Sequence, residues 1–187
     1  NGAAPAPVTA LKNAADPVIA VIGNPNTGKS TLFNALTGLR QKTANYPGVT
    51  VERHTGHIKL DGHNVTLVDL PGAYSIAAQS PDEMVAIDVL LGHVEDLPRP
   101  RAILAVVDAT NLRRNLFLVT QLAELGLPMV IGLNMTDLAA EKGIEVDIAA
   151  LGAGLGAQVV ALSAARGTGL DGLRRALATA INAPSPP

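Results

Sequence analysis

Residues 18–30 read Val-Ile-Ala-Val-Ile-Gly-Asn-Pro-Asn-Thr-Gly-Lys-Ser, and this stretch decides the architecture of the chain. A short, continuous apolar run such as residues 18–22 is typical of a strand buried on both faces of a sheet. The glycine-rich segment after it leads into residues 29–39, where apolar side chains recur at helical spacing. These apolar positions are Leu32, Phe33, Leu36 and Leu39. The stretch therefore predicts a strand, a tight loop and a helix in direct succession.

The rest of the chain continues this alternation of strand-like and helix-like segments. Strands are expected at residues 51–60, 64–70, 103–107, 129–133 and 159–162, and helices at residues 81–92, 111–125 and 170–182. Asp61-Gly62 joins the first two of these strands and is a strong hairpin signal. The order predicts an α/β fold of the P-loop NTPase type, with a mainly parallel sheet, one antiparallel hairpin strand and helices on both faces.

One domain accounts for nearly all of the sequence. We expect it to cover residues 17–183, with an Ala- and Pro-rich flexible tail at residues 1–16 and a tail or linker at residues 184–187. Hydrophobic residues make up 48% of the 187 residues and charged residues 16%, so disorder over most of the chain is excluded.

Composition also excludes several classes of function. The 14 basic and 16 acidic residues give a net charge of −2, which provides no general reason to expect nucleic acid as a partner. The sequence contains no Cys, so disulfides, thiolate zinc sites and cysteine nucleophiles are ruled out. No apolar run approaches the roughly 20 residues that a membrane-spanning helix needs.

Residues 23–30 fit the pattern Gly, four residues, Gly-Lys-Ser, between a strand and a helix. Backbone N–H groups of such a loop converge on phosphate oxygens, and the helix start adds partial positive charge. Lys29 would contact the outer phosphates and Ser30 would ligate Mg²⁺. The expected nucleotide-binding residues here are Gly23, Asn24, Pro25, Asn26, Thr27, Gly28, Lys29, Ser30 and Thr31. The alternative, an ordinary glycine-rich turn, is disfavoured by this placement.

A second motif, Asp69-Leu70-Pro71-Gly72, ends an apolar strand. The strand would bring the Asp69 carboxylate to the edge of the sheet beside the phosphate loop, where it can hold Mg²⁺ through a water. The Gly72 N–H would be free to meet the γ-phosphate. The alternative is a plain strand followed by a Pro-Gly turn. This alternative is disfavoured only because a phosphate loop precedes the motif in the chain.

The base-reading motif distinguishes GTP from ATP. Asn134-Met135-Thr136-Asp137 follows a buried strand, and a carboxylate such as Asp137 accepts the two N–H donors of guanine, which adenine lacks. Asn134 would tie the loop together and reach the other edge of the base. Ser163-Ala164-Ala165, after the last strand, would complete the base pocket with backbone donors. For Asp137 alone, a helix cap is the competing explanation.

Together these motifs resemble those of the TrmE-Era-like GTPases and, more narrowly, the cytosolic G domain of the bacterial ferrous-iron transporter family FeoB. The narrower resemblance rests on Gly-Asn-Pro-Asn-Thr-Gly-Lys-Ser, on Asn45-Tyr46-Pro47-Gly48-Val49-Thr50-Val51-Glu52 as first switch, and on Asp69-Leu70-Pro71-Gly72-Ala73-Tyr74-Ser75 as second switch. Asn134-Met135 also suits this family. The resemblance covers about residues 17–182.

The resemblance implies roles for matching residues. Thr50 would ligate Mg²⁺ beside Ser30 and Asp69 and would order the first switch in the GTP state. Asn26 would help hold a K⁺ beside the phosphates, with backbone carbonyls of residues 44–46, although a turn-forming role explains Asn26 equally well. Lys29, Asn26, Thr50 and Gly72 would then form the catalytic set, with water as the nucleophile.

The second switch lacks the water-orienting glutamine of Ras-like proteins, because Ala73 follows Gly72. Slow, potassium-stimulated GTP hydrolysis is therefore expected, and a nucleotide-sensing module with negligible turnover is one alternative. A ribosome-assembly GTPase is another, disfavoured by the net charge and by the lack of an RNA-binding extension. Arg113 and Arg114 begin a helix and are expected to be solvated rather than catalytic.

The resemblance also places the domain in a larger protein. In the family, helical regulatory and membrane domains follow the G domain, and neither is found in these 187 residues. The expected partners are guanine nucleotide and the protein's own helical and transmembrane domains. A homo-oligomer remains open, and no nucleic acid is expected. The domain would lie at the cytoplasmic face of the bacterial inner membrane and regulate ferrous-iron uptake.

A few side chains are expected to be ordinary. His54, His57 and His63 are predicted to be exposed rather than metal-bound, because residues three apart on a strand face opposite sides. Phe33 and Phe117 are expected in the core. Tyr46 is expected to flank the nucleotide site and to move with nucleotide state.

Overall fold

The computed structural model describes residues 15–184. Over this range the chain forms a seven-stranded sheet with the order β2-β3-β4-β1-β5-β6-β7. The strands are β1 (Val18–Gly23), β2 (Gln41–Asn45), β3 (Glu52–Leu60), β4 (His63–Asp69), β5 (Ala102–Asp108), β6 (Met129–Asn134) and β7 (Gln158–Ala161). β1 pairs in parallel with β4 and β5, and the parallel pairing continues through β6 to β7. β3 pairs antiparallel with β2 and β4, which confirms the α/β class with an antiparallel hairpin.

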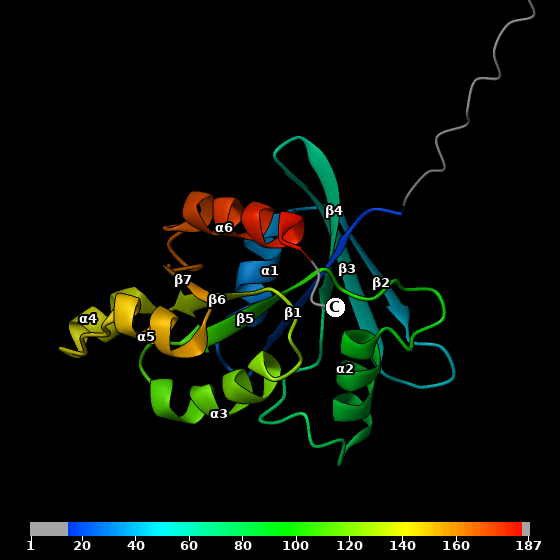
Figure 1. Cartoon of the computed structure of the whole chain (residues 1–187), viewed down its shortest axis with the longest axis horizontal. Coiled ribbons are helices and arrows are strands. Elements are labelled where there is room, and N and C mark those ends of the chain that lie inside the picture. Colours follow the sequence, from blue (N-terminus) through cyan, green and yellow to red (C-terminus); the bar gives the residue numbers. More distant parts are fainter. Residues whose placement is uncertain (1–14, 185–187) are drawn as a thin grey trace, which may run out of the picture.

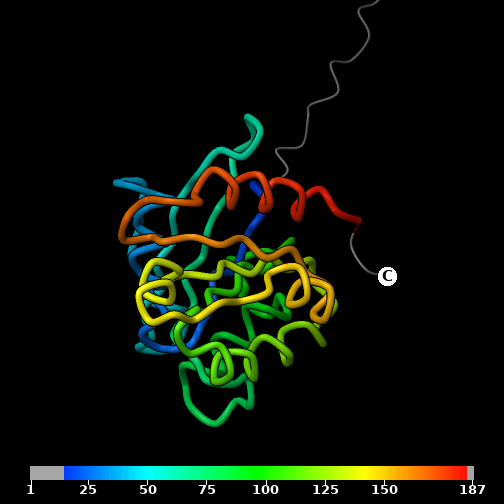
Figure 2. Tube along the Cα trace, turned by 90° about the vertical axis from the view of Figure 1, so that its left-hand side faces the viewer, coloured from blue at the N-terminus to red at the C-terminus, as the bar shows by residue number. Residues whose placement is uncertain are grey.

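Helices cover both faces of the sheet, as Figures 1 and 2 show. α1 (Lys29–Thr37) and α6 (Leu170–Asn182) lie on one face, and α2 (Pro81–Leu91) and α3 (Leu112–Ala123) lie on the other. α4 (Thr136–Glu141) and α5 (Ile148–Leu155) lie between β6 and β7 in the chain, at the β7 end of the sheet. The arrangement places three layers over one another, with the sheet in the middle.

β1 shows how the sheet builds a core on each side. All six of its residues are buried, and successive side chains point to opposite faces. Ile19 and Val21 belong to the cluster with α1 and α6, whereas Ala20 and Ile22 belong to the cluster with α2 and α3. The continuous apolar run at residues 18–22 is therefore the central strand that its pattern predicts.

Two apolar side chains lie elsewhere than expected. Helix α1 ends at Thr37 because Gly38 takes a positive φ of 60°, so Leu39 leaves the apolar stripe and is fully exposed at 103%. Phe117 was expected in the core, but it lies on the outer side of α3 and is 60% exposed. Phe33 is buried as expected.

Three elements were not expected from the sequence. β2 carries polar side chains and is almost wholly exposed, so it has no apolar alternation to reveal it. α4 is only six residues long, and α5 has no buried residue and contains Gly152 and Gly154. Helix α2, by contrast, starts where Pro81 predicts, with the Ser80 hydroxyl accepting from the Glu83 N–H.

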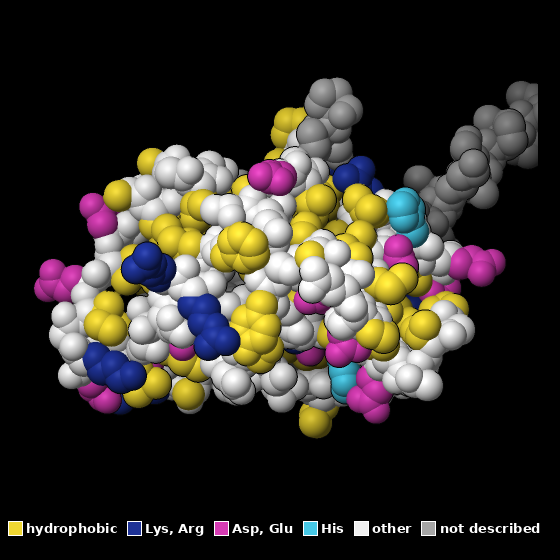
Figure 3. All heavy atoms as spheres, turned by 90° about the horizontal axis from the view of Figure 1, so that it is seen from below, with side chains coloured by type: hydrophobic (Ala, Val, Ile, Leu, Met, Phe, Trp, Pro, Cys, Tyr) yellow, Lys and Arg dark blue, Asp and Glu magenta, His cyan; other side chains and the backbone are white. Residues whose placement is uncertain are grey.

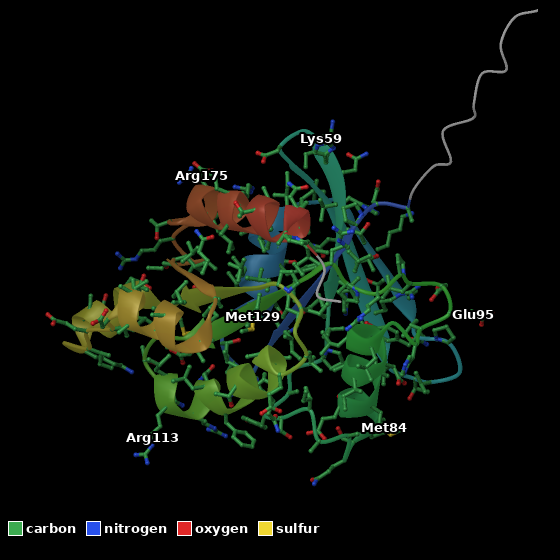
Figure 4. All side chains as sticks on the ribbon, in the orientation of Figure 1. Lys59, Met84, Glu95, Arg113, Met129 and Arg175 are labelled. Atoms are coloured by element: carbon green, nitrogen blue, oxygen red, sulfur yellow. The ribbon has the colours of Figure 1, made fainter. Side chains whose placement is uncertain are left out.

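The surface over α2 and α3 separates charge. In Figure 3, most Lys and Arg side chains of this face lie at the left, toward α3, and most acidic and His side chains lie at the right, toward α2. Figure 4 shows Arg113 and Met84 pointing outward from this side, whereas Met129 lies inside the molecule. Among the described residues, no helix is both long and apolar enough to cross a bilayer.

The two ends of the described chain meet at the sheet end opposite the carboxyl ends of the parallel strands. The Arg101 N–H donates to the Val18 carbonyl, and the Arg101 guanidinium donates to the Ile181 carbonyl at 3.2 Å. These residues line a cavity of about 660 Å³. The expected tails at residues 1–16 and 184–187 fall almost entirely outside the described residues.

Candidate functional site

The phosphate-loop pattern forms a tight turn between β1 and α1. Asn26 and Gly28 have positive φ values of 65° and 77°, and the Thr27 hydroxyl donates to the Asn24 carbonyl at 3.0 Å. The loop borders a cavity of about 420 Å³ at the N-terminus of α1. This cavity is lined by Asn24, Pro25, Asn26, Gly28, Lys29, Ser30, Thr31 and Gly72. The structure thus brings the second switch glycine beside the loop, as expected.

Glycine is required at two positions of this loop by close approach. A Cβ at Gly23 would lie 2.6 Å from the Val106 carbonyl oxygen. A Cβ at Gly28 would overlap the Asn134 side-chain amide, and the positive φ of Gly28 disfavours any L side chain as well. The loop is therefore pressed against β5 on one side and against the base-reading motif on the other.

Lys29 and Asp69 form an ion pair beside the loop, with side chains only 11% and 12% exposed. Asp69 ends β4, next to β1 in the sheet, so the parallel pairing brings the carboxylate to the loop. Lys29, Asp69 and Thr50 line a second cavity of about 440 Å³, and Lys29 also lines the loop cavity. Oxygen donors of Ser30, Thr50 and Asp69 thus border two cavities that share one lysine.

Two of the three histidines are less exposed than predicted. His63 is exposed, whereas His54 and His57 are half-buried on β3. His54 lines the same cavity as Thr50 and Asp69, and the sequence pattern did not suggest that His54 would be their neighbour. His57 contacts the Thr66 hydroxyl at 3.3 Å. Within residues 15–184, no three His, Cys, Asp or Glu side chains are grouped to hold a metal ion by themselves.

Asn134 joins the phosphate loop to the loop after β7. Its side-chain amide donates to the Thr27 carbonyl at 2.9 Å, and its side-chain oxygen accepts from the Ala164 N–H at 2.9 Å. The side chain is buried, so both of its polar ends are satisfied inside the protein. This geometry agrees with the expectation that Asn134 ties the loop together, whereas its expected contact with the other edge of the base stays a prediction.

The remaining base-reading residues lie around Asn134. Met135 takes a positive φ of 63° and precedes α4, which places Asp137 in the first turn of that helix. The Thr136 hydroxyl donates to the Leu162 carbonyl at 2.9 Å, holding α4 to the end of β7. Ser163 and Ala164 are buried and Ala165 is exposed.

Arg166 faces Asp137 across the two loops, and no motif pointed to it. Its Nε lies 3.1 Å from Asp137 Oδ2, and its terminal nitrogen lies 3.6 Å from Glu141 Oε1. The Asp137 side chain is 18% exposed, whereas the Arg166 side chain is 62% exposed. An ion pair between residues so far apart in sequence becomes visible only when the strands bring their loops together.

Tyr46, in the first switch, is buried against α2 at 3% exposure. Within residues 15–184 its hydroxyl has no hydrogen-bond partner, and burial raises the pKa of the Tyr46 hydroxyl to about 12. The Arg53 guanidinium lies 5.5 Å from the ring centre and pairs with both Asp96 carboxylate oxygens at 2.8 Å. Tyr46 packs against α2 and lines neither of the two cavities at the phosphate loop, so its place beside the nucleotide stays a prediction.

The second switch packs on α3. The Arg114 guanidinium lies 4.7 Å from the Tyr74 ring centre, and the Gln121 side chain accepts from the Ile76 N–H at 3.1 Å. Arg114 is exposed, as expected, but it contacts the switch rather than bulk solvent alone. Ala73 is buried and its N–H donates to the Gly23 carbonyl at 3.1 Å. Neither Ala73 nor Tyr74 lines the loop cavity.

All of these groups meet at the carboxyl ends of β1, β4, β6 and β7. The phosphate-loop cavity offers backbone N–H groups and the Lys29 ammonium. The Asn134 side chain connects this cavity to the motif that carries the Asp137 carboxylate. Such an edge can hold an anionic group at one end and a ring with two neighbouring donors at the other.

Comparison with known proteins gives a consistent result. The model of the family described as ferrous iron transport protein B matches residues 17–177. The chain is 48% identical over 163 residues to the Fe(2+) transporter FeoB of Shigella flexneri and to that of Escherichia coli strain K12. Each match covers 85% of this chain and 20% of the relative, so the chain spans about one fifth of the length of these curated proteins.

Solved structures are also similar. The FeoB G-domain from Methanococcus jannaschii is 41% identical with a TM-score of 0.77, and the match covers 90% of this chain and 99% of that one. A mutant of S. thermophilus NFeoB bound to mGDP is 46% identical with a TM-score of 0.82, covering 89% of this chain and 62% of that one.

Proposed function

The chain belongs to the ferrous iron transport protein B family, and from this premise we propose that it binds GTP with Mg²⁺ and hydrolyses it slowly to GDP and phosphate. One observation carries the proposal: Asn134 bonds both the phosphate loop and the 163–166 loop. A single buried side chain thereby fixes the spacing between the phosphate cavity and Asp137. A carboxylate at that place accepts the ring N–H and the amino group of guanine, which adenine does not offer.

Phosphate binding rests on the loop and Lys29. Residues 24–26 and 28–31, which lead into the N-terminus of α1, line the cavity, and all of them except Pro25 carry a backbone N–H that favours negative charge there. Lys29 borders both cavities, so its ammonium can serve the outer phosphates while it remains close to Asp69. The Gly72 N–H, on the facing side of the cavity, is the proposed contact to the γ-phosphate.

Mg²⁺ fits the oxygen donors at the junction of the two cavities. Ser30 and Thr50 would supply hydroxyl oxygens and Asp69 a carboxylate, through a water, which are ligand types that Mg²⁺ prefers. When bound, the ion would neutralise charge on the phosphate oxygens. We also propose K⁺ beside Asn26 and the carbonyls of residues 44–46. Asn26 lines the cavity, but its positive φ also suits its alternative role as a turn former.

The proposed nucleophile is water, and the chain offers little to orient it. Ala73 is buried and Tyr74 contacts Arg114, so the second switch presents no side-chain amide to the phosphate cavity. Charge stabilisation by Lys29, Thr50 and the loop N–H groups would carry the reaction. The unassisted rate of Ras-type proteins, roughly 10⁻⁴ s⁻¹, sets the scale we expect without K⁺.

The role in the whole protein extends the family assignment. The curated relatives are named Fe(2+) transporters, and the chain spans about one fifth of their length. We propose that nucleotide state in this domain regulates ferrous-iron uptake through helical and membrane parts of the complete protein. The domain would then work at the cytoplasmic face of the bacterial inner membrane, alone or as a homo-oligomer.

Base selection is tested by Asp137→Asn. Replacing the acceptor carboxylate by an amide should shift preference from GTP to XTP, because xanthine presents an oxygen where guanine presents the amino group. Nucleotide affinity measured by calorimetry checks this. Asp171→Asn is the matched control, since Asp171 also lies in the first turn of a helix but is 90% exposed and lines neither cavity at the phosphate loop. Retained guanine preference in Asp137→Asn would contradict the assignment.

Turnover in KCl and in NaCl separates the enzyme from its alternatives. Marked stimulation by K⁺ supports the hydrolase. GTP binding without turnover in either salt would favour a nucleotide-sensing module. This alternative stands because position 73 is alanine and offers no side-chain amide to orient water. Salt-sensitive binding of RNA would instead indicate a ribosome-assembly type of GTPase.

A further inference from the structure

Arg166 sits on a loop that is fixed at several points. Ser163 and Thr168 exchange backbone hydrogen bonds at 3.1 Å, and the Ser163 hydroxyl accepts from the Arg166 N–H at 3.3 Å. The Ala164 N–H is held by Asn134 at 2.9 Å. The backbone that carries Arg166 is thus attached to the same side chain that holds the phosphate loop.

The guanidinium reaches from this loop to α4. It approaches Asp137 at 3.1 Å through Nε and Glu141 at 3.6 Å through a terminal nitrogen. Asp137 and Glu141 are four residues apart on one helix and therefore lie on the same face. The Glu141 side chain is 64% exposed, whereas the Asp137 side chain is only 18% exposed. Of the two carboxylates that Arg166 contacts, the less exposed one is therefore the one proposed to read the base.

A base-reading carboxylate has to present both oxygens in the plane of the purine. The terminal torsion of Asp is broad and roughly two-fold, so an unrestrained carboxylate spends much of its time out of that plane. Arg166 holds its Nε 3.1 Å from one oxygen, Oδ2, as an ion-pair partner, which favours one orientation of the carboxylate. Each carboxylate oxygen can accept two hydrogen bonds, so Oδ2 can accept from Arg166 and from guanine at the same time.

We propose that Arg166 is a positioning residue for base selection: the fork between Asp137 and Glu141 orients the Asp137 carboxylate toward the two N–H donors of guanine. This inference rests on the proposed guanine specificity of the site. Arg166 acts through Asp137 and makes no contact with the phosphate cavity. Its effect should therefore fall on recognition of the base rather than on hydrolysis.

The experiment compares GDP with IDP, which lacks the exocyclic amino group, by calorimetry on the whole chain. Arg166→Ala should weaken GDP binding about three- to fivefold, the size expected for a partly exposed ion pair. IDP uses only one of the two donors, so its affinity should fall less and the GDP-to-IDP preference should narrow. In turnover assays, KM for GTP should rise by more than kcat falls.

Two further variants distinguish orientation from charge. Arg166→Lys keeps the positive charge but lacks the planar guanidinium whose separate nitrogens reach Asp137 and Glu141, so it should not restore the GDP-to-IDP preference. Arg174→Ala is the matched control, because Arg174 pairs with exposed Asp171 on its own helix and not with Asp137 or Glu141. It should bind GDP like the unaltered chain. Unchanged melting temperatures for all three variants would show that folding is intact.

The outcomes are separable. If the unaltered chain binds no guanine nucleotide, the proposed function itself fails. If the unaltered chain binds GDP but Arg166→Ala binds GDP and IDP with unchanged affinities, the positioning role is overturned. Tighter GDP binding by Arg166→Ala would also overturn it, because Arg166 would then compete with guanine for Asp137. Full rescue by Arg166→Lys would replace orientation by simple charge compensation.

Discussion

Tyr46 combines a favourable and an unfavourable contribution to stability in one side chain. Its ring is buried at 3% exposure among apolar residues of α2 and the sheet, and Arg53 lies over one side of it. Its hydroxyl is buried without a hydrogen-bond partner, which costs about 1–3 kcal/mol for a group of this kind. The ring therefore holds the first switch against α2, while the hydroxyl contributes nothing to that anchor.

Tyr46→Phe should leave the free energy of unfolding unchanged or raise it by about 1 kcal/mol at neutral pH, because it removes an unpaired polar atom and keeps the ring. The pH dependence is the sharper measurement. Burial raises the pKa of Tyr46 from its ordinary value near 10 to about 12, so the folded protein holds this proton more tightly than the unfolded chain. Stability should be fully present below pH 10 and should fall by about 1.4 kcal/mol per pH unit up to pH 12.

Urea unfolding of the unaltered chain and of Tyr46→Phe between pH 8 and 12 checks both points. The difference between the two proteins isolates Tyr46 from the lysines that also titrate in this window. A constant difference across this pH range would show that Tyr46 ionises equally easily in the folded and unfolded states.

At the residue level, the sequence pattern predicts the groups proposed to contact a nucleotide better than the groups that support them. Gly28, Lys29, Asp69 and Asp137 follow strand ends in recognisable order, and the structure gathers them at one edge of the sheet. Arg166 could not be anticipated, because its partner Asp137 lies on another loop and no spacing rule connects them. The burial of Tyr46 likewise depends on how the first switch folds over α2.

Among the elements, α3 connects the phosphate loop with the second switch. The Arg114 carbonyl accepts from the Asn24 side chain at 3.5 Å, and the Arg114 guanidinium covers Tyr74. About two turns further along α3, the Gln121 side chain accepts from the Ile76 N–H. A displacement of the second switch would therefore change its contacts with α3 and, through the Asn24–Arg114 hydrogen bond, the position of the phosphate loop.

Arg114→Ala should loosen the second switch, because it removes the cation over the Tyr74 ring, a contact worth about 0.5–1 kcal/mol at exposed sites. Hydrogen exchange of residues 74–77 should then become a few-fold faster. Arg113→Ala is the matched control, since Arg113 precedes it on α3 and points away from the molecule (Figure 4). Equal exchange rates in the two variants would argue that Gln121 alone holds the switch.

Strong apolar periodicity explains which elements could be predicted. β1, β5 and β6 are continuous buried runs, and the structure places them at the centre of the sheet. β2 pairs by backbone alone with exposed polar side chains, and α5 buries none of its residues. Neither element leaves an apolar pattern in the sequence, so only pairing and packing with neighbours reveal them.

On the scale of the whole molecule, the two cores share a single sheet. Side chains of β1, β5 and β6 alternate between the cluster under α2 and α3 and the cluster under α1 and α6. Leu122 from α3 and Leu177 from α6 are both fully buried, one in each cluster. Loss of packing on either face should therefore weaken the strands that both faces need.

Leu122→Ala and Leu177→Ala should each lower stability by about 2–5 kcal/mol and shift the same single unfolding transition. Far-UV circular dichroism during thermal unfolding checks this. Leu39→Ala is the control, because Leu39 is fully exposed and its truncation removes no packing. A second, separate transition in either core variant would show that the two faces unfold independently.

Arg101 bonds both Val18 and Ile181, so the start of the first strand and the end of the last helix lie within reach of one residue. The nucleotide edge lies at the other end of the strands. A circularly permuted version of the domain is therefore feasible: a short glycine linker could close residues 17 and 183, and new termini could open in the exposed segment around Gly143. The permuted protein would keep every strand in register. It would still recognise guanine nucleotide, although its polypeptide would start at a different residue.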